Sequence, residues 1–282
     1  MARARSAAGA ILFTYLAARA FWWVSGQPWR ALDDVWIEGL LKGLVWVIPA
    51  VLVLIAVRRL SLHEAFGELG LDSSMARGYG FGLLATVPMV LALPFGAAYS
   101  IDPAVFVGTV LLGPFAEEVL FRGFLFKQLL RRARWPLSWA IGVSAVVFAL
   151  AHFQDLDHEL IGQLAMLQAS DIQREFVRQS LGLESRSVID LLIRVATTIA
   201  VLAPGGALFA WVVHRFGSLW PAIGLHACLN LWWMISHGPD ARGVFTLDAS
   251  GIAQVVALGF AFLLTFRKPG RAWVIGQSAL GN

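Results

Sequence analysis

The stretch GPFAEEVLFRGFLF, residues 113–126, places two adjacent glutamates and an arginine inside an otherwise apolar helical run. Each such charge costs roughly 2.5–3.5 kcal/mol near the centre of a membrane helix. The rest of the chain indicates a membrane setting, because 58% of its 282 residues are hydrophobic and 14% are charged, against about one quarter charged in soluble domains. We therefore predict an all-α, polytopic membrane helical bundle, since helices satisfy their own backbone hydrogen bonds in lipid.

Apolar runs near the length of a membrane-crossing helix recur along the whole chain. They cover residues 7–25, 39–57, 79–98, 104–126, 136–153, 188–213, 219–237 and 252–266. The pattern predicts one integral membrane domain over residues 1–282 with about eight transmembrane helices. The first run resembles a signal peptide, with Ala18-Arg19-Ala20 as a cleavage site, but apolar residues resume at Phe21, so we expect a retained helix.

The basic residues stand at the ends of the apolar runs. If the spans alternate, 13 lysines and arginines fall on one side, and five arginines fall in the opposite loops: Arg30, Arg174, Arg178, Arg186 and Arg242. The positive-inside rule then puts both termini in the cytoplasm. No basic stripe exists to hold phosphates, which excludes nucleic acid as a partner, and the single cysteine, Cys228, excludes an intramolecular disulfide or a cysteine-based zinc site.

The polar loop at residues 154–187 interrupts the apolar pattern. Leu160, Ile161, Leu164 and Leu167 recur near helical spacing within it, which favours an amphipathic helix at the membrane surface. A solvated linker fits the composition equally well. Both interpretations stay open at the level of sequence.

The three charges of the opening stretch do not all have a local partner. Glu118 and Arg122 are four residues apart, so they share a helix face and can pair. Glu117 is rotated by about 100° from Glu118, and no opposite charge lies three or four positions from it. A buried charge network that only fixes packing explains Glu118 and Arg122 well. Glu117 is expected to be an unpaired carboxylate in a desolvated pocket, which suits a general base.

Two of the six histidines, His152 and His226, are flanked by apolar residues typical of transmembrane helices. Asn230 follows His226 by four residues, on the same helix face. A lone histidine on an apolar face is usually a satisfied core residue. Here two such histidines occur together with Asn230 and two glutamates in a bundle with few charged residues, which indicates a functional site instead.

Three motifs stand in order within these helices. They are EEVLFR with Glu117, Glu118 and Arg122, FALAH with Phe148 and His152, and HACLN with His226 and Asn230. They match the patterns EExxxR, FxxxH and HxxxN. Over residues 104–235, the expected catalytic core, the chain resembles the CPBP family of intramembrane proteases, also called the CAAX-protease and bacteriocin-processing or Abi family.

The resemblance implies a metal-independent glutamate protease that needs no cofactor. By that analogy Glu117, assisted by His152, activates the attacking water, and His226 and Asn230 stabilise the oxyanion. Glu118, Arg122 and Phe148 would support the site. The residues agree with this, because a base, an orienting group and two donors are what water-mediated amide hydrolysis requires.

The resemblance also implies a location and partners. The protein is expected in the bacterial inner (cytoplasmic) membrane, as a multi-pass protein of the lipid bilayer. Its substrate would be a protein or peptide, lipidated or membrane-anchored, that is matured or loses its C-terminal segment.

Two alternatives and one geometric difficulty remain. Glu117, His152 and His226 could ligate zinc as a His₂Glu set. A non-catalytic membrane scaffold or bacteriocin-immunity protein of the same fold would also carry these helices. The predicted spans put His226 about 10 Å inside the cytoplasmic edge, at 1.5 Å per residue, and His152 near the opposite edge. Both reach Glu117 only if the fifth span is tilted or runs past residue 153.

Overall fold

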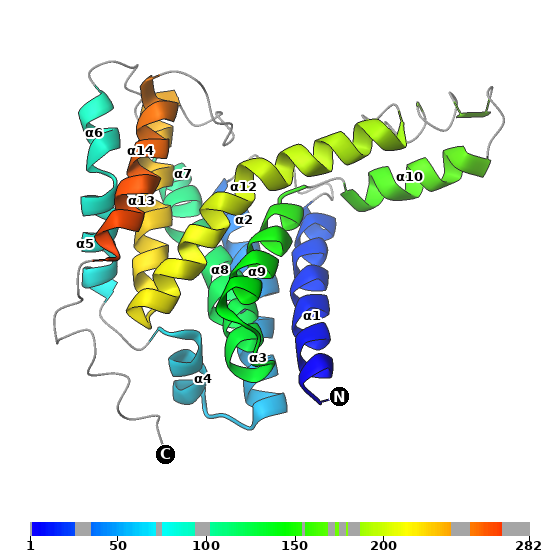
Figure 1. Cartoon of the computed structure of the whole chain (residues 1–282), viewed down its shortest axis with the longest axis horizontal. Coiled ribbons are helices and arrows are strands. Elements are labelled where there is room, and N and C mark those ends of the chain that lie inside the picture. The colour runs from blue at the N-terminus through cyan, green and yellow to red at the C-terminus, as the bar shows by residue number, and fades with distance from the viewer. Residues whose placement is uncertain are drawn as a thin grey trace.

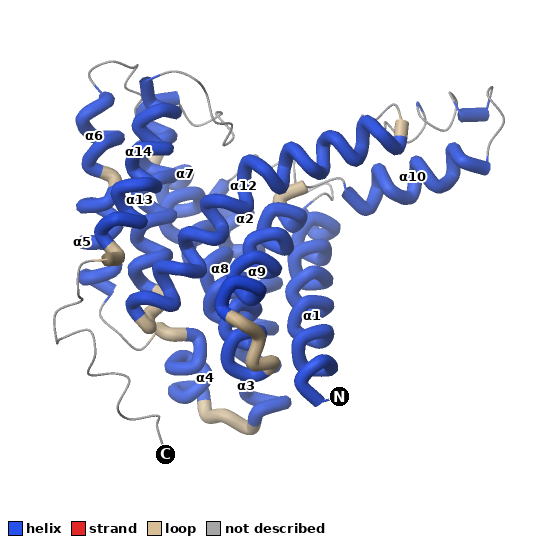
Figure 2. The backbone as a smooth tube through the Cα atoms, in the orientation of Figure 1, coloured by secondary structure: helices blue, strands red, loops and turns tan. Residues whose placement is uncertain are grey.

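The computed structural model describes residues 2–25, 35–71, 75–93, 102–153, 156–168, 173–174, 179, 187–237 and 249–266. Every regular element in these residues is a helix (Figures 1 and 2). The prediction of an all-α protein is therefore confirmed for the part of the chain that the structure describes. Seven of the arginines and lysines that were counted by side of the membrane lie outside the described residues: Arg30, Arg178, Arg186, Arg242, Arg267, Lys268 and Arg271.

The helices follow one another as α1 (Ala2–Ser25), α2 (Val35–Lys42), η2 (Gly43–Val47), α3 (Ile48–Arg58), α4 (Leu62–Leu69), α5 (Met75–Ala85), α6 (Val87–Ala92), α7 (Pro103–Val105), η4 (Phe106–Leu112), α8 (Gly113–Glu118), η5 (Val119–Phe126), η6 (Gln128–Arg132), α9 (Leu137–Ala151), α10 (Leu156–Gln168), α12 (Val188–Phe216), α13 (Trp220–His237) and α14 (Ala249–Leu264). The segments labelled η are π-helical. Each predicted span overlaps at least one of these helices, and the end of the third span, 94–98, lies outside the described residues.

Three helices in the described residues are long and apolar enough to cross a bilayer: Gly39–Arg58, Pro103–Arg132 and Val188–Phe216. Two further apolar helices are shorter, Leu137–Ala151 and Gly251–Leu264. Several long apolar helices in one chain are the mark of an integral, multi-pass membrane protein.

The helix Pro103–Arg132 forms the centre of the bundle. Asp102 caps its start, because a carboxylate oxygen of Asp102 accepts a hydrogen bond of 2.7 Å from the Ala104 N–H. All eight residues of η5 are buried, so other helices surround this segment on every side. Wide π-helical turns are rare and are frequent at functional sites. Here they flank the two glutamates of α8 on both sides.

A tight turn at residues 133–136 leads from the central helix into α9. Arg134 has a left-handed backbone with φ 56°, which lets the chain reverse. Glu117 lies 17 residues before Arg134, and His152 lies 17 residues after Trp135. In two antiparallel helices, residues at equal distances from the turn stand at the same level. The helix continues past the predicted end of the fourth span at residue 126, to Arg132. This extra length brings His152 to the level of Glu117 although α9 ends at Ala151.

Helix α13 begins beside the middle of the central helix. The Leu219 N–H donates to the Gly70 carbonyl at 2.8 Å. A Cβ on Gly123 would lie 3.2 Å from the Leu219 side chain, so the start of α13 is level with Gly123. His226 follows Leu219 by seven residues and Glu118 precedes Gly123 by five. Because α13 runs antiparallel to the central helix, His226 arrives at the level of the glutamates.

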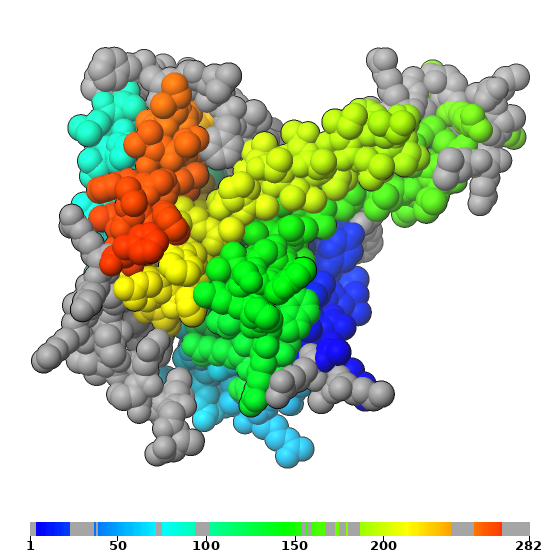
Figure 3. All heavy atoms as spheres, in the orientation of Figure 1, coloured from blue at the N-terminus to red at the C-terminus, as the bar shows by residue number. Residues whose placement is uncertain are grey.

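Helix α10 and the first half of α12 project from the bundle as an arm (Figure 3). Glu159 is buried between these helices and pairs with Arg194 at 3.1 Å. The apolar side chains Leu160, Ile161 and Leu164 are exposed instead. Helix α10 thus forms within the polar loop expected at 154–187, and its placement at the membrane surface stays a prediction.

Candidate active site

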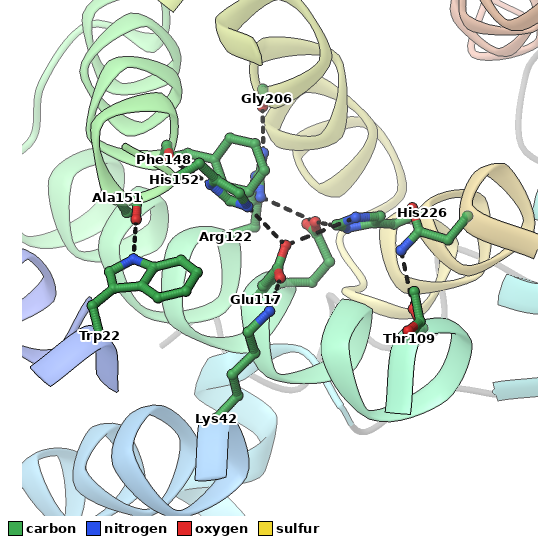
Figure 4. A network of polar contacts seen from close by, with 12 residues as sticks. Trp22, Lys42, Thr109, Glu117, Arg122, Phe148, Ala151, His152, Gly206 and His226 are labelled. Carbon is green, nitrogen blue, oxygen red and sulfur yellow. Dashed lines mark hydrogen bonds and ion pairs between the residues drawn. The ribbon is translucent and has the colours of Figure 1, made fainter. Parts of the chain in front are cut away.

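Glu117 and Glu118 close α8, and both carboxylates are buried. One oxygen of Glu118 accepts a hydrogen bond of 3.0 Å from the Arg122 guanidinium, and neither side chain of this ion pair is exposed at all. The same oxygen lies 2.9 Å from Nδ1 of His226. Glu118 therefore joins the first motif to the third, and Figure 4 shows Arg122 and His226 in one network of polar contacts.

Arg122 sits in an aromatic and backbone pocket. Its guanidinium carbon lies 4.1 Å from the centre of the Phe148 ring and 5.1 Å from that of Phe209. A second guanidinium nitrogen donates to the Gly206 carbonyl at 3.2 Å. The planar guanidinium stacks on aromatic rings and donates from two nitrogens to two different acceptors, which holds it in one orientation. The expected pair of Glu118 and Arg122 is present, and it also ties the central helix to α9 and α12.

His152, at the end of α9, approaches the other glutamate. Its Nε2 lies 3.4 Å from Oε2 of Glu117. Its Nδ1 lies 2.8 Å from the Phe148 carbonyl, so Nδ1 must be the donor, because a carbonyl only accepts. Phe148 thus fixes the His152 ring through its backbone and supports Arg122 through its own ring.

Helix α1 holds the end of α9 in place. The Trp22 indole N–H donates to the Ala151 carbonyl, and Arg19 donates to the Phe153 carbonyl at 2.9 Å. The last carbonyls of a helix have no partner within the helix, and α1 supplies partners on both sides of His152. This support was not predicted from the sequence, although Arg19 is a charge inside an apolar run.

His226 faces the same oxygen of Glu117 from α13. Its Nε2 lies 3.8 Å from Oε2 of Glu117, and its ring stacks on Phe209 with centres 5.0 Å apart and planes 16° apart. Its Nδ1 donates to the ionised Glu118. In a neutral imidazole Nε2 is then an acceptor, in His226 as in His152.

Asn230 makes a contact of a different kind. Its amide nitrogen donates to the Thr109 carbonyl at 3.0 Å. The contact that the structure gives Asn230 therefore leads to the backbone of η4, whereas Glu117, Glu118, Arg122 and the two histidines form one network.

Lys42 corrects one expectation about the site. Glu117 was expected to have no charged partner on its own helix and to be approached by the histidines, but Nζ of Lys42 also lies 2.8 Å from its Oε1. Lys42 comes from the end of α2, 75 residues away in sequence, so no count of positions along one helix could reveal it. Its charge inside the predicted span 39–57 was the available signal, because intramembrane charges are expensive and usually functional.

The atoms that converge on Oε2 of Glu117 are the ones that could hold a metal, namely Nε2 of His152 and Nε2 of His226. Among the described side chains, no group of three or more His, Cys, Asp or Glu residues has the spacing of a metal site. Two imidazole nitrogens and a carboxylate oxygen thus meet at one point, an arrangement that can bind a proton or a water molecule.

Comparisons with known proteins agree with the motifs. The family model described as "Type II CAAX prenyl endopeptidase Rce1-like" matches residues 99–232. No curated protein and no solved structure matches the chain significantly. The matched residues include the whole central helix from Pro103, α9 and the part of α13 that carries His226 and Asn230. Residues 99–232 therefore form a domain of the Rce1-like type II CAAX prenyl endopeptidase family (CPBP).

Proposed function

We propose that this protein is a metal-independent, glutamate-type intramembrane endopeptidase in which Glu117 and His152 activate a water molecule. One observation carries the proposal: Oε2 of Glu117 and Nε2 of His152, two proton acceptors, lie 3.4 Å apart, and Nε2 of His226 lies 3.8 Å from the same oxygen. A water molecule can donate two hydrogen bonds to such a set. The family supports the same reaction, since its name is that of an endopeptidase.

The reaction follows from the acceptors. Oε2 of Glu117 takes a proton from water as the water oxygen bonds to the carbonyl carbon of the peptide, and the carbonyl π electrons move onto its oxygen. Nε2 of His152 orients the water by accepting its second hydrogen. Glu117 then returns the proton to the amide nitrogen as the C–N bond breaks. General base catalysis of this kind contributes typically about 10²–10⁴-fold to a rate.

His226 and Asn230 are proposed to stabilise the oxyanion. Nε2 of His226 is proposed to donate to the oxyanion, with the ring held in place by the contact of 2.9 Å between Nδ1 and the Glu118 carboxylate. The Asn230 amide has two hydrogens, of which one goes to Thr109. The other is proposed to serve the oxyanion.

The electrostatics favour chemistry without a metal. A cation held by Glu117, His152 and His226 would lie close to the Lys42 ammonium, which is 2.8 Å from the same carboxylate. Like charges at such distances repel strongly in a site of low dielectric constant. A water molecule carries no charge and meets no such repulsion.

We propose residues 104–235 as the catalytic core of one integral membrane domain over 1–282, in the inner membrane of a bacterium. Its eight helices cross the bilayer and both termini lie in the cytoplasm, as the distribution of basic residues favours. The substrate is a protein or peptide, lipidated or membrane-anchored, that loses its C-terminal segment.

The test is the variant Glu117→Gln, assayed with a fluorogenic farnesylated CAAX peptide in detergent or liposomes. It keeps the size of the side chain and removes the proton acceptor, so we expect cleavage at least about 10²-fold slower. Glu64→Gln is the matched control, because Glu64 is exposed on α4 and remote from the site. A proteomic comparison of membranes with wild type and Glu117→Gln would identify natural substrates.

Two results would overturn the proposal. Loss of activity in phenanthroline with recovery on adding zinc would reassign Glu117, His152 and His226 as ligands. A wild type that cleaves nothing, while wild type and Glu117→Gln bind a partner equally well, would favour the scaffold or immunity protein.

A further inference from the structure

Lys42 is a buried cation at the proposed site that no motif includes. Its Nζ lies 2.8 Å from Oε1 of Glu117, with 13% of the lysine side chain and 8% of the glutamate side chain exposed. An ammonium and a carboxylate this close and this shielded interact far more strongly than a surface pair.

The position of the ammonium is fixed by aromatic rings. Nζ lies 5.4 Å from the centre of the Phe21 ring and 5.5 Å from that of Trp46. These two rings pack edge to face with centres 5.0 Å apart, and the Trp46 indole N–H donates to the Ala17 carbonyl at 2.9 Å. The faces of aromatic rings attract cations. Phe21 of α1 and Trp46 of η2 therefore hold the Lys42 ammonium in place from two sides.

Close backbone contact sets the distance from Lys42 to Glu117. A Cβ on Gly39 would lie 2.8 Å from the Leu112 side chain and 3.2 Å from Gly108. Only glycine at position 39 lets α2 lie this near to η4. Lys42 follows Gly39 by three residues, on the same side of the helix, and so reaches α8.

The two oxygens of Glu117 thereby have different tasks. Lys42 holds Oε1, and the histidines face Oε2 at 3.4 Å and 3.8 Å. Because Lys42 holds Oε1, the carboxylate of Glu117 cannot rotate Oε2 away from the two histidines. Other charged or titratable groups also lie near the pair of Lys42 and Glu117 in the described residues. They are Glu118 and Arg122 on the central helix, His152 after α9 and His226 on α13.

We propose that Lys42 is a positioning residue for the general base: it holds Oε1 of Glu117 and so aims Oε2 at the water. This inference rests on the proposed function. Before the reaction Lys42 and Glu117 are an ion pair with Nζ 2.8 Å from Oε1. When Oε2 takes the water proton, the glutamic acid is neutral and the negative charge resides on the carbonyl oxygen of the peptide. The ammonium is nearer to Glu117 than to that oxygen, so Lys42 contributes to the rate by orienting the base rather than by stabilising the oxyanion.

The kinetic test compares Lys42→Met and Lys42→Arg with wild type on the same farnesylated CAAX peptide. Lys42→Met keeps the length of the side chain and removes the charge, so Oε2 is no longer held toward the water and kcat falls by about 10²-fold, as for a misplaced catalytic group. KM stays unchanged, because Lys42 contacts the general base and not the substrate. Lys42→Arg restores the charge and recovers part of kcat. Lys127→Met is the matched control. Lys127 is also a buried lysine, but it follows η5, whereas the two glutamates precede η5.

A second test needs no substrate. Thermal unfolding of Lys42→Met, Glu117→Gln and the double variant forms a double-mutant cycle. Each single variant leaves one buried charge uncompensated and lowers the midpoint. The double variant leaves none, so its loss is smaller than the sum of the two single losses.

The outcomes separate this inference from the proposed function. Additive losses in the cycle would show that the two charges are not coupled and would overturn the role of Lys42. The role of Lys42 would also be overturned if Lys42→Met kept the kcat of wild type while Glu117→Gln was inactive. Coupled losses in a wild type that cleaves nothing would retain the pairing but overturn the proposed function, and with it the role of Lys42 in catalysis.

Discussion

At the scale of single residues, the site is a balanced set of buried charges. Lys42 and Arg122 face Glu117 and Glu118, so two cations compensate two carboxylates when the histidines are neutral. Burying an ion pair is expensive, but removing one partner is worse, because the other charge stays behind in a medium of low dielectric constant. The balance explains how a bundle with so few charged residues can hold four of them together.

Arg122→Ala tests this balance. It leaves Glu118 buried without its cation, so we expect a loss of roughly 3–5 kcal/mol in the free energy of unfolding. The loss is measured as a lower midpoint of thermal unfolding in detergent and a lower folded yield. Arg131→Ala is the control, because Arg131 is 42% exposed and lies 3.9 Å from its carboxylate partner, Glu68. Equal midpoints for Arg122→Ala and wild type would contradict the structural role of the pair.

At the scale of helices, a proline joins the third motif to the first. In the π-helical pattern the Gly113 N–H donates to the Gly108 carbonyl. The next bond would run from residue 114 to the Thr109 carbonyl, but Pro114 has no N–H. Asn230 donates to that carbonyl instead, at 3.0 Å. The amide of α13 thus replaces a missing backbone donor and fixes α13 against the central helix.

The prediction at this scale is a rescue. Asn230→Ala leaves the buried Thr109 carbonyl unsatisfied and costs about 1–3 kcal/mol of stability. Pro114→Ala restores an N–H at the right place, so Asn230→Ala with Pro114→Ala recovers much of the loss in thermal unfolding. Ser236→Ala is the control on the same helix, since Ser236 bonds only to its own helix at Trp232.

The rescue also separates two roles of Asn230. If its second hydrogen serves the oxyanion, the double variant regains stability and remains slow in the peptide assay. No recovery of stability in the double variant would show that Thr109 does not depend on Asn230.

At the scale of the whole molecule, one end of the bundle carries a basic cluster. Arg58, Arg131 and Arg132 converge on Glu68 of α4 at 3.1–3.9 Å, and α4 lies at the end of the bundle where α1 begins (Figure 1). Arginines gather on the cytoplasmic side of membrane proteins. This cluster therefore agrees with a cytoplasmic N-terminus and with an arm of α10 and α12 at the opposite face.

Reporter fusions check the topology. A reporter after Asn282 is expected in the cytoplasm, and one inserted within 160–185 is expected on the other side of the membrane. Both should leave the protein in the membrane fraction. Two reporters on the same side would mean that the number of crossing helices is not eight.

The features that follow from hydropathy and local spacing could be predicted from the sequence. Membrane helices are long apolar runs, so their existence is encoded locally, and each predicted span overlaps a helix. The pairing of Glu118 with Arg122 follows from a spacing of four on one helix. The motif residues of the three helices could be selected because charges and histidines are rare in such runs.

Only the tertiary structure decided which of these side chains meet. The levels of His152 and His226 depend on where the helices begin and end, at Arg132 and at Leu219, and helix ends are poorly encoded by hydropathy in a continuous apolar run. The partner of Glu117 is 75 residues away, and Lys42 reaches it only because Gly39 lets two helices touch. The sequence by itself determined the membrane fold class and the candidate chemistry, since both depend on local composition. The pairing of Lys42 with Glu117 and of Asn230 with Thr109 required the structure, because contacts between helices depend on packing that no single helix encodes.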